Sequence, residues 1–194
     1  MLDSAERERA SRFVFPEHRR RFVQAHAALR QILHRYTAIL PGELRFAAGS
    51  NGKPYLSHPA AGALSFNLSH SGDLAVAAVG EVPEVGVDIE CIRPIPDWEE
   101  IARRSFHPME SEWVLSLPAE RRTDAFFQVW TKKEAYIKAA GHGLSQPLDS
   151  FQVVEPAGQK KYVIAGLELP AGYAGAVAYA PPQCEVRLNW WKEA

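Results

Sequence analysis

Two carboxylates stand out in the segment VGVDIE at residues 85–90 because they alternate with apolar residues. Successive side chains of a strand point to opposite faces. The valines and the isoleucine would then enter a core, while Asp88 and Glu90 share the other face with Gly86. A glycine on that face leaves room for a neighbouring element. The same pattern also fits the solvated face of an edge strand, so its meaning depends on a partner.

A third carboxylate lies among lysines in WTKKEAYIKAAGHGL at residues 130–144. Trp130, Glu134 and Lys138 are spaced by four residues and would share one face of a helix. The simplest interpretation is a helical Glu–Lys pair, worth about 0.2–0.5 kcal/mol. If this face meets the strand of Asp88 and Glu90, three carboxylates converge, and their repulsion is offset best by a cation. Oxygen ligands without His or Cys suit Mg²⁺, which also binds substrate phosphates, and Lys138 would hold such a phosphate.

Other polar residues could bind further phosphates. NLSHS at 67–71 places Ser69 and His70 at a predicted turn, and GKP at 52–54 fixes Lys53 between a flexible and a rigid residue. Arginines bind phosphate bidentately, and the N-terminal part offers Arg9, Arg12, Arg19, Arg20 and Arg21. Each also has an ordinary interpretation, as an exposed turn histidine, a plain turn and a solvated helix face.

Composition excludes several classes of protein. The chain has 194 residues, of which 46% are apolar and 23% charged, which is typical of a globular protein. Cys91 and Cys184 form neither a disulfide framework nor a zinc pattern. The polar N-terminus is not a secretory signal, and LAVAAV at 74–79 is too short to span a bilayer. These features predict a cytoplasmic protein without membrane contact.

The formal net charge of −1 is distributed unevenly. Residues 1–40 hold eight arginines against four acids, whereas residues 81–112 hold nine acids against three arginines. A nucleic-acid-binding protein would need a wide basic face. We therefore expect no nucleic-acid partner, but a protein that handles a polyanion with the help of a cation.

The predicted elements indicate the α+β class. Apolar residues at helical spacing predict a helix over 17–40, with Pro16 suited to its first position. Two apolar runs around a Ser-Gly-Asp turn predict a hairpin over 63–80. A second long helix is expected from Pro118 to Ala140, ending at Gly141.

Shorter elements complete the prediction. A helix should begin near Asp97, and CIRPIPD at 91–97 is the expected hinge between two halves, residues 1–90 and 91–194. Strands are expected at 85–90 and near 151–154, 161–164, 174–180 and 184–190.

Taken together, these motifs resemble the Sfp-type 4′-phosphopantetheinyl transferases. The resemblance rests on five motifs in the family's order, GKP (52–54), FNLSHS (66–71), GVDIE (86–90), SFHPME (105–110) and WTKKEAYIKAAGHGL (130–144). It implies two similar α+β lobes with the active site between them. It also implies transfer of the 4′-phosphopantetheine arm of coenzyme A (CoA) to a serine of an apo carrier protein, with release of adenosine 3′,5′-bisphosphate.

The resemblance implies roles for the acidic and lysine residues. The Mg²⁺ ligands, with Mn²⁺ as a substitute, would be Asp88, Glu134 and, directly or through water, Glu90. Glu110 would accept the proton of the carrier serine. Lys138 would hold the reacting phosphate, and Lys133 is a weaker candidate for the same neighbourhood.

The nucleotide end of CoA would be bound by Arg9, Arg21, Gly52, Lys53, Pro54, Ser69 and His70. Glu6 departs from the basic residue that some relatives carry one turn before Arg9. A carrier of acyl, peptidyl or polyketide type is the implied partner of a monomeric enzyme. Its docking surface is expected at Arg103, Arg104, Met109, Trp113 and Arg121.

Two alternatives stay open at this point. A Mg²⁺-dependent hydrolase of nucleotide pyrophosphates would release product without a carrier protein. A non-catalytic module that binds CoA or a carrier would lack one of the acidic residues, whereas this chain has all four.

Overall fold

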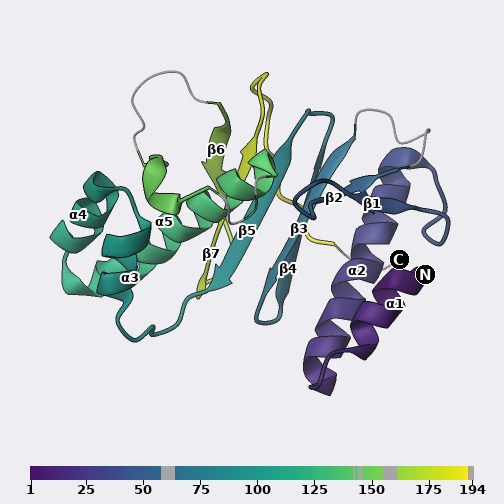
Figure 1. Cartoon of the computed structure of the whole chain (residues 1–194), viewed down its shortest axis with the longest axis horizontal. Helices are drawn as coiled ribbons and strands as arrows, with labels where there is room; N and C mark the ends of the chain where they lie inside the picture. The colour runs from purple at the N-terminus through teal and green to yellow at the C-terminus, as the bar shows by residue number, and fades with distance from the viewer. Residues whose placement is uncertain (58–63, 142, 144–145, 155–160, 192–194) are drawn as a thin grey trace.

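The computed structural model describes residues 1–57, 64–141, 143, 146–154 and 161–191. It confirms the α+β class, with helices and antiparallel sheets in two lobes that lie side by side (Figure 1). The elements are α1 (Ser4–Ser11), α2 (Pro16–Thr37), β1 (Phe46–Ala48), β2 (Pro54–Leu56), β3 (Ser65–Ser71), β4 (Leu74–Gly80), β5 (Val85–Cys91), α3 (Trp98–Ser105), α4 (Pro108–Ser116), α5 (Ala119–Ala140), the 3₁₀ turn η3 (Leu148–Ser150), β6 (Val163–Gly166) and β7 (Tyr173–Tyr179).

The N-terminal lobe packs α2 against the hairpin of β3 and β4. Leu29 and Leu33 of α2 are buried with Leu44 and Phe66, and this cluster forms the lobe's core. The hairpin confirms the predicted one, with its antiparallel register running from Ser65 opposite Gly80 to the turn. The two lobes meet where β3 lies beside β5, the first strand of the C-terminal sheet.

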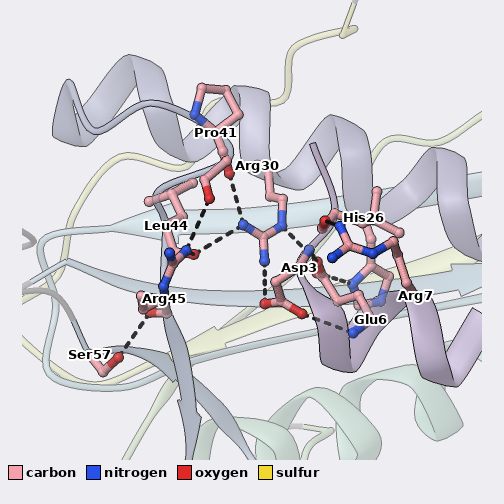
Figure 2. A network of polar contacts seen from close by, with 11 residues as sticks. Asp3, Glu6, Arg7, His26, Arg30, Pro41, Leu44, Arg45 and Ser57 are labelled. Atoms are coloured by element: carbon pink, nitrogen blue, oxygen red, sulfur yellow. Dashed lines mark hydrogen bonds and ion pairs between the residues drawn. The ribbon is translucent and has the colours of Figure 1, made fainter.

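A buried arginine attaches α1 to α2. The Arg30 guanidinium is fully buried and donates to Glu6 at 2.7 Å, to Asp3 at 2.5 Å and to two backbone carbonyl groups (Figure 2). His26 adds a 2.9 Å contact to Glu6. Burial acts to raise the pKa of Glu6, but His26, the backbone of Asp3 and Arg30 together outweigh it and lower that pKa. Glu6 therefore attaches α1, the helix that carries Arg9, to α2.

The C-terminal lobe is a sheet in the order β5-β7-β6 covered by α5. Gly86 permits close contact between β5 and α5. A Cβ atom at this position would lie 2.2 Å from both the carbonyl oxygen of Ala135 and the backbone nitrogen of Ala139. The helix backbone therefore lies directly on the strand, as the space at Gly86 suggested.

Several predicted boundaries need correction. Residues 4–11 form α1, which was not predicted, and the helix expected near Asp97 is divided into α3 and α4 before Pro108. Residues 151–154 and 184–190 form no strand. β5, which lies before the predicted division at 90/91, pairs with β7 along its full length. β5 therefore belongs to the C-terminal sheet.

Among the residues that the structure describes, none of the helices combines the length and hydropathy needed to cross a bilayer. The C-terminal segment packs back on the first lobe, where the Arg35 guanidinium lies 4.2 Å from the centre of the Trp191 ring. The two lobes are therefore in contact at more than one place.

Candidate active site

The junction of α5 with β5 brings together the residues that the sequence predicted to act together. Lys138 Nζ lies 2.6 Å from Asp88 Oδ1, although the two residues are 50 positions apart. Glu134 lies one turn earlier on the same helix, close enough to Asp88 and Glu90 that both raise its pKa. The two motifs therefore form one site, and the face of VGVDIE that carries Asp88 packs against α5 and is not solvated.

Asp88 is the most buried carboxylate of this site, with a relative exposure of 5%. Its Oδ1 atom accepts hydrogen bonds from Lys138 and from Ser69 Oγ at 3.1 Å. Its Oδ2 atom is buried and has no hydrogen-bond partner among the described residues. Burial raises the pKa of Asp88, against the opposing effect of Lys138. A buried carboxylate oxygen without a partner is unfavourable unless a cation or a donor reaches it.

The other two carboxylates flank Asp88. Burial is the main reason that the pKa of Glu134 is raised, and the negative charges of Asp88 and Glu90 add to it. The Glu90 carboxylate accepts a 2.7 Å hydrogen bond from Ser71 Oγ. Three carboxylates therefore repel one another around a single lysine.

The arrangement fits a divalent cation without forming a finished cage. Within the described ranges, no group of three or more His, Cys, Asp or Glu side chains is gathered closely enough to hold a metal ion. Instead, the Lys138 ammonium contacts Asp88, while Asp88 Oδ2 keeps an unused lone pair. Oxygen-only donors with surplus negative charge are the type of site that Mg²⁺ prefers. The types of donor therefore suit the predicted ion, although the described side chains are not gathered around a single metal position.

Glu110 and Lys133 lie in a buried network of their own. Lys133 Nζ lies 2.6 Å from Glu110 Oε2, and it donates to the carbonyl oxygens of Leu148 and Phe151. The other Glu110 oxygen accepts the N–H group of Val153 at 2.5 Å. With 0% and 2% relative exposure, both residues lack solvent contact. The expectation that Lys133 contacts CoA finds no support in these contacts, because its donors are already engaged.

The GKP loop meets the C-terminal end of α5. Lys53 Nζ donates to the carbonyl oxygen of Ala139 at 2.9 Å, and Asn51 donates to that of Gly141 at 2.8 Å. Gly52 has a φ of +80°, which glycine adopts readily, and Pro54 starts β2. Lys53 therefore contacts Ala139, the residue that follows Lys138 in α5, at the lobe junction. His142 and Leu144 of the same motif fall outside the described residues.

His70 lies in cationic surroundings. Burial is the main reason that its pKa is lowered, and His26, Lys138, Arg9 and Arg21 add to the effect. Arg21 and His70 line one end of a cavity of about 530 Å³ between α2, β4 and the C-terminal segment. Arg9 stacks over the Phe22 ring at 5.3 Å, and Arg21 pairs with Asp73 at 2.8 Å. Arg9, Arg21 and His70 thus lie near one another, whereas Lys53 and its loop contact the end of α5.

Sequence reasoning named Ser69 but did not predict that side chains of β3 would bridge to β5. Asn67, Ser69 and Ser71 accept hydrogen bonds from backbone N–H groups of β5. Their two-residue spacing in NLSHS was a visible signal, because it places all three on one face of a strand.

An acidic group beside a cationic group, at a junction of two α+β lobes, is the arrangement of an enzyme that handles a phosphate-rich substrate. Comparison with known families makes the class specific. The model described as "4′-phosphopantetheinyl transferase superfamily" matches residues 84–179, and "4′-phosphopantetheinyl transferase, N-terminal" matches residues 1–82. The chain belongs to the 4′-phosphopantetheinyl transferase superfamily, which confirms the predicted family.

Individual relatives carry the same name. 4′-Phosphopantetheinyl transferase HetI of Nostoc sp. is 47% identical over 161 residues, which cover 80% of this chain and 68% of HetI. 4′-Phosphopantetheinyl transferase psf-1 of Bacillus pumilus is 42% identical, over 75% of this chain and 60% of its own length. 4′-Phosphopantetheinyl transferase Sfp of Bacillus subtilis is 34% identical, over 93% of this chain and 83% of Sfp. The chain thus spans between 60% and 83% of these relatives.

Proposed function

We propose that this protein transfers the 4′-phosphopantetheine arm of CoA to a serine of an apo carrier protein. The observation that supports this best is the contact between Lys138 and Asp88, with Glu134 one turn away. It joins the two most specific motifs of the family in one site. The relatives' shared name supplies the reaction.

In the proposed reaction, the carrier serine oxygen bonds to the β-phosphorus of CoA. The bond from that phosphorus to the bridging pyrophosphate oxygen breaks, and adenosine 3′,5′-bisphosphate leaves with the electron pair. Asp88, Glu90 and Glu134 would hold Mg²⁺, which neutralises charge on pyrophosphate oxygens when bound. Lys138 would turn from Asp88 to the reacting phosphate, where a fixed cation stabilises the growing charge.

The serine proton needs an acceptor, and Glu110 is the residue predicted for it. That role stays a prediction. Its oxygens are engaged by Lys133, by the backbone of Val153 and by the N-cap of α4, so Glu110 would have to give up a contact to act. The buried pair also fixes the orientation of α5, which is a positioning role that these contacts support directly.

The nucleotide end of CoA is assigned to the cationic region around His70. Its 3′-phosphate would be bound by His70 together with Arg9 and Arg21, because both arginines lie close enough to His70 to lower its pKa. Ser69 contacts Lys138 and would bind the pyrophosphate, together with Lys53, which contacts the carbonyl oxygen of the following residue, Ala139. Gly52 and Pro54 would shape the adenine pocket through the loop that they form.

The carrier protein is expected to bind at α3, α4 and the start of α5. Met109 is 65% exposed and Trp113 is 37% exposed on α4, and exposed apolar side chains of this size favour a partner. Arg103 and Arg104 end α3, and Arg121 lies in the first turn of α5. Charge reversal at Arg103 or Arg104 should raise the Michaelis constant for carrier; an unchanged constant would count against this surface.

The experiment that tests the function is intact mass spectrometry of an apo carrier protein incubated with this protein, CoA and Mg²⁺. A mass gain of one phosphopantetheine arm that a chelator prevents would support the proposal and the metal requirement together. CoA cleavage without carrier modification would favour a hydrolase. CoA binding without any reaction across acyl, peptidyl and polyketide carriers would favour a binding module.

We further propose a monomer in the cytoplasm. Both lobes of the site come from one chain, so no second copy is needed to complete it. Cys91 and Cys184 are free thiols, as in a reducing compartment.

A further inference from the structure

Strands β3 and β5 lie side by side at the lobe junction, although they belong to different sheets (Figure 1). Three β3 side chains bridge them. Asn67 Oδ1 accepts the N–H group of Val87 at 2.9 Å. Ser69 Oγ and Ser71 Oγ accept those of Ile89 at 3.3 Å and Cys91 at 3.0 Å. Side chains thus satisfy strand amides that backbone carbonyl groups would satisfy in a continuous sheet.

The two serines make a second, matching contact. Ser69 Oγ donates its proton to Asp88 Oδ1, and Ser71 Oγ donates its proton to Glu90 Oε2. Each hydroxyl therefore accepts from one β5 residue and donates to the carboxylate of the residue before it. A serine hydroxyl has one proton and two lone pairs, so the accepted N–H group fixes the direction in which the proton points.

Asn67 shows that the choice between serine and asparagine on β3 depends on the β5 residue that faces it. The residue before Val87 is Gly86, which has no side chain to orient, and the α5 backbone occupies that space. Here β3 carries an amide whose oxygen accepts the N–H group. Serine is therefore found where a carboxylate must be oriented.

Glu90 depends on its serine more than Asp88 does. Asp88 is also held by Lys138, and Ser69 contacts Lys138 as well, so a change at Ser69 would disturb several groups. Within the described part of the chain, Ser71 provides the only hydrogen bond to the Glu90 carboxylate. An unconstrained glutamate on a strand edge would sample several rotamers, and ordering such a side chain has an entropic cost.

We propose that Ser71 is a positioning residue that orients Glu90 toward Mg²⁺, through a hydroxyl group held by the Cys91 amide. The inference rests on the proposed function, because it concerns the metal that this function requires. It assigns to the last serine of NLSHS a role separate from phosphate binding. The hydrogen bond restricts the directions that the Glu90 carboxylate can take, as the outer partners of metal ligands do.

The test compares Ser71→Ala with Ser71→Thr, which keeps the hydroxyl group. Ser65→Ala is the matched control, because Ser65 lies on the same strand and face but donates to the Pro83 carbonyl oxygen, away from any carboxylate. Calorimetric titration of CoA over a range of Mg²⁺ concentrations gives the Mg²⁺ requirement for CoA binding without turnover. Amide hydrogen exchange at Cys91 reports on the bridge itself.

Ser71→Ala should raise the Mg²⁺ concentration needed for half-maximal enhancement of CoA affinity by roughly 10-fold or more, the usual effect of removing a group that orients a metal ligand. CoA affinity in chelator should stay unchanged, and exchange at Cys91 should accelerate. Ser71→Thr should restore both values, and Ser65→Ala should match the wild type.

A wild-type Mg²⁺ response in Ser71→Ala, or a Ser71→Thr variant as impaired as Ser71→Ala, would overturn the proposal. So would a wild-type protein whose CoA affinity ignores Mg²⁺. Failure of the proposed function has a different signature. The carrier would then stay unmodified, while the Mg²⁺ response of CoA binding and its dependence on Ser71 would still support the positioning role.

Discussion

Lys133 and Glu134 are neighbours in the sequence, yet their side chains lie in opposite environments. The Lys133 ammonium is fully buried against Glu110 at 2.6 Å, whereas the Glu134 carboxylate faces Asp88 and Glu90. The lysine thus anchors one side of α5 in the C-terminal lobe while the acid is presented on the other side. Glu134 is therefore part of the carboxylate group at β5 and not simply the partner of Lys138 in a surface ion pair.

The buried pair makes Glu110→Gln informative in two ways. The substitution leaves the Lys133 ammonium buried without its counter-charge, and breaking such a pair costs about 3–5 kcal/mol. Burial already lowers the pKa of Lys133 and Glu110 opposes that shift, so losing Glu110 should lower this pKa further. Urea unfolding should show the loss of stability. If Glu110 is also the general base, turnover of the folded variant should fall by about 10²–10⁴-fold with CoA affinity kept.

Glu112→Gln serves as the control for Glu110→Gln, because Glu112 lies on the same helix but is exposed. Turnover that survives in folded Glu110→Gln would eliminate the base assignment and leave the positioning role. Unchanged stability in Glu110→Gln would argue against the positioning role.

Glu134→Gln should abolish Mg²⁺-dependent turnover while preserving or raising stability. Burial and the nearby carboxylates raise the pKa of Glu134, so its ionisation opposes folding. That cost is absent below its ordinary pKa of 4.5 and appears as pH rises through the higher pKa of the folded state. The gain in Tm of the glutamine variant should therefore be larger at pH 8 than at pH 4.

Thermal unfolding at both pH values, together with the carrier assay, checks the Glu134 prediction. Glu120→Gln, in the exposed first turn of the same helix, should change neither quantity. An active Glu134→Gln enzyme would refute the metal assignment.

Gly86→Ala should separate α5 from β5. The added methyl group would lie 2.2 Å from two backbone atoms of the helix, so the helix must move. Overpacking of this kind costs about 1–3 kcal/mol. Displacement of Glu134 and Lys138 should also reduce turnover strongly. Urea unfolding and the carrier assay measure the two effects.

Gly166→Ala is the matched control, since it lies in the same sheet with nothing within 4 Å of the added atom. Equal effects of the two substitutions would mean that close packing at Gly86 does not set the geometry of the site.

CoA binding should take up a proton at His70. The lowered pKa keeps the free imidazole neutral near and somewhat below its ordinary value of 6.5, whereas a bound phosphate favours the charged form. CoA affinity should therefore fall as pH rises through this range. Calorimetry in two buffers of different ionisation enthalpy measures the uptake.

His70→Gln should remove the proton uptake, and His18→Gln, an exposed substitution on α2, should retain it. Uptake that persists in His70→Gln would assign the proton to another group, such as His26.

The sequence predicted the parts of the fold that depend on local pattern. Helical periodicity and Gly141 located α5, and the apolar runs around Gly72 located the hairpin. It predicted strand 184–190 wrongly, because the apolar residues there are exposed and packing rather than alternation decided their state. The partners of Lys133 come from residues 110, 148 and 151, and a spacing within one helix cannot reveal such distant contacts.

The same limit applies to the site. Two periodicities predicted the main site residues. The period of a strand placed Gly86 and Asp88 on one face, and the period of a helix placed Glu134 and Lys138 on one face. The role of Glu6 could not be predicted from either periodicity. Its function is to bind the buried Arg30, which lies 24 residues away, so the apparent departure from a basic residue is a structural contact (Figure 2).

The helix α5 is held by both lobes at once. Its aromatic part, with Phe126 and Trp130, packs in the C-terminal lobe, while Lys53 and Asn51 of the other lobe bind its last carbonyl groups. The alignment of Asp88 with Lys138 therefore depends on packing within and between the lobes, and not only on residues 81–84, the segment that joins β4 to β5. A chain cut in that segment would keep the contacts of Lys53 and Asn51 with α5, which can hold the two pieces together.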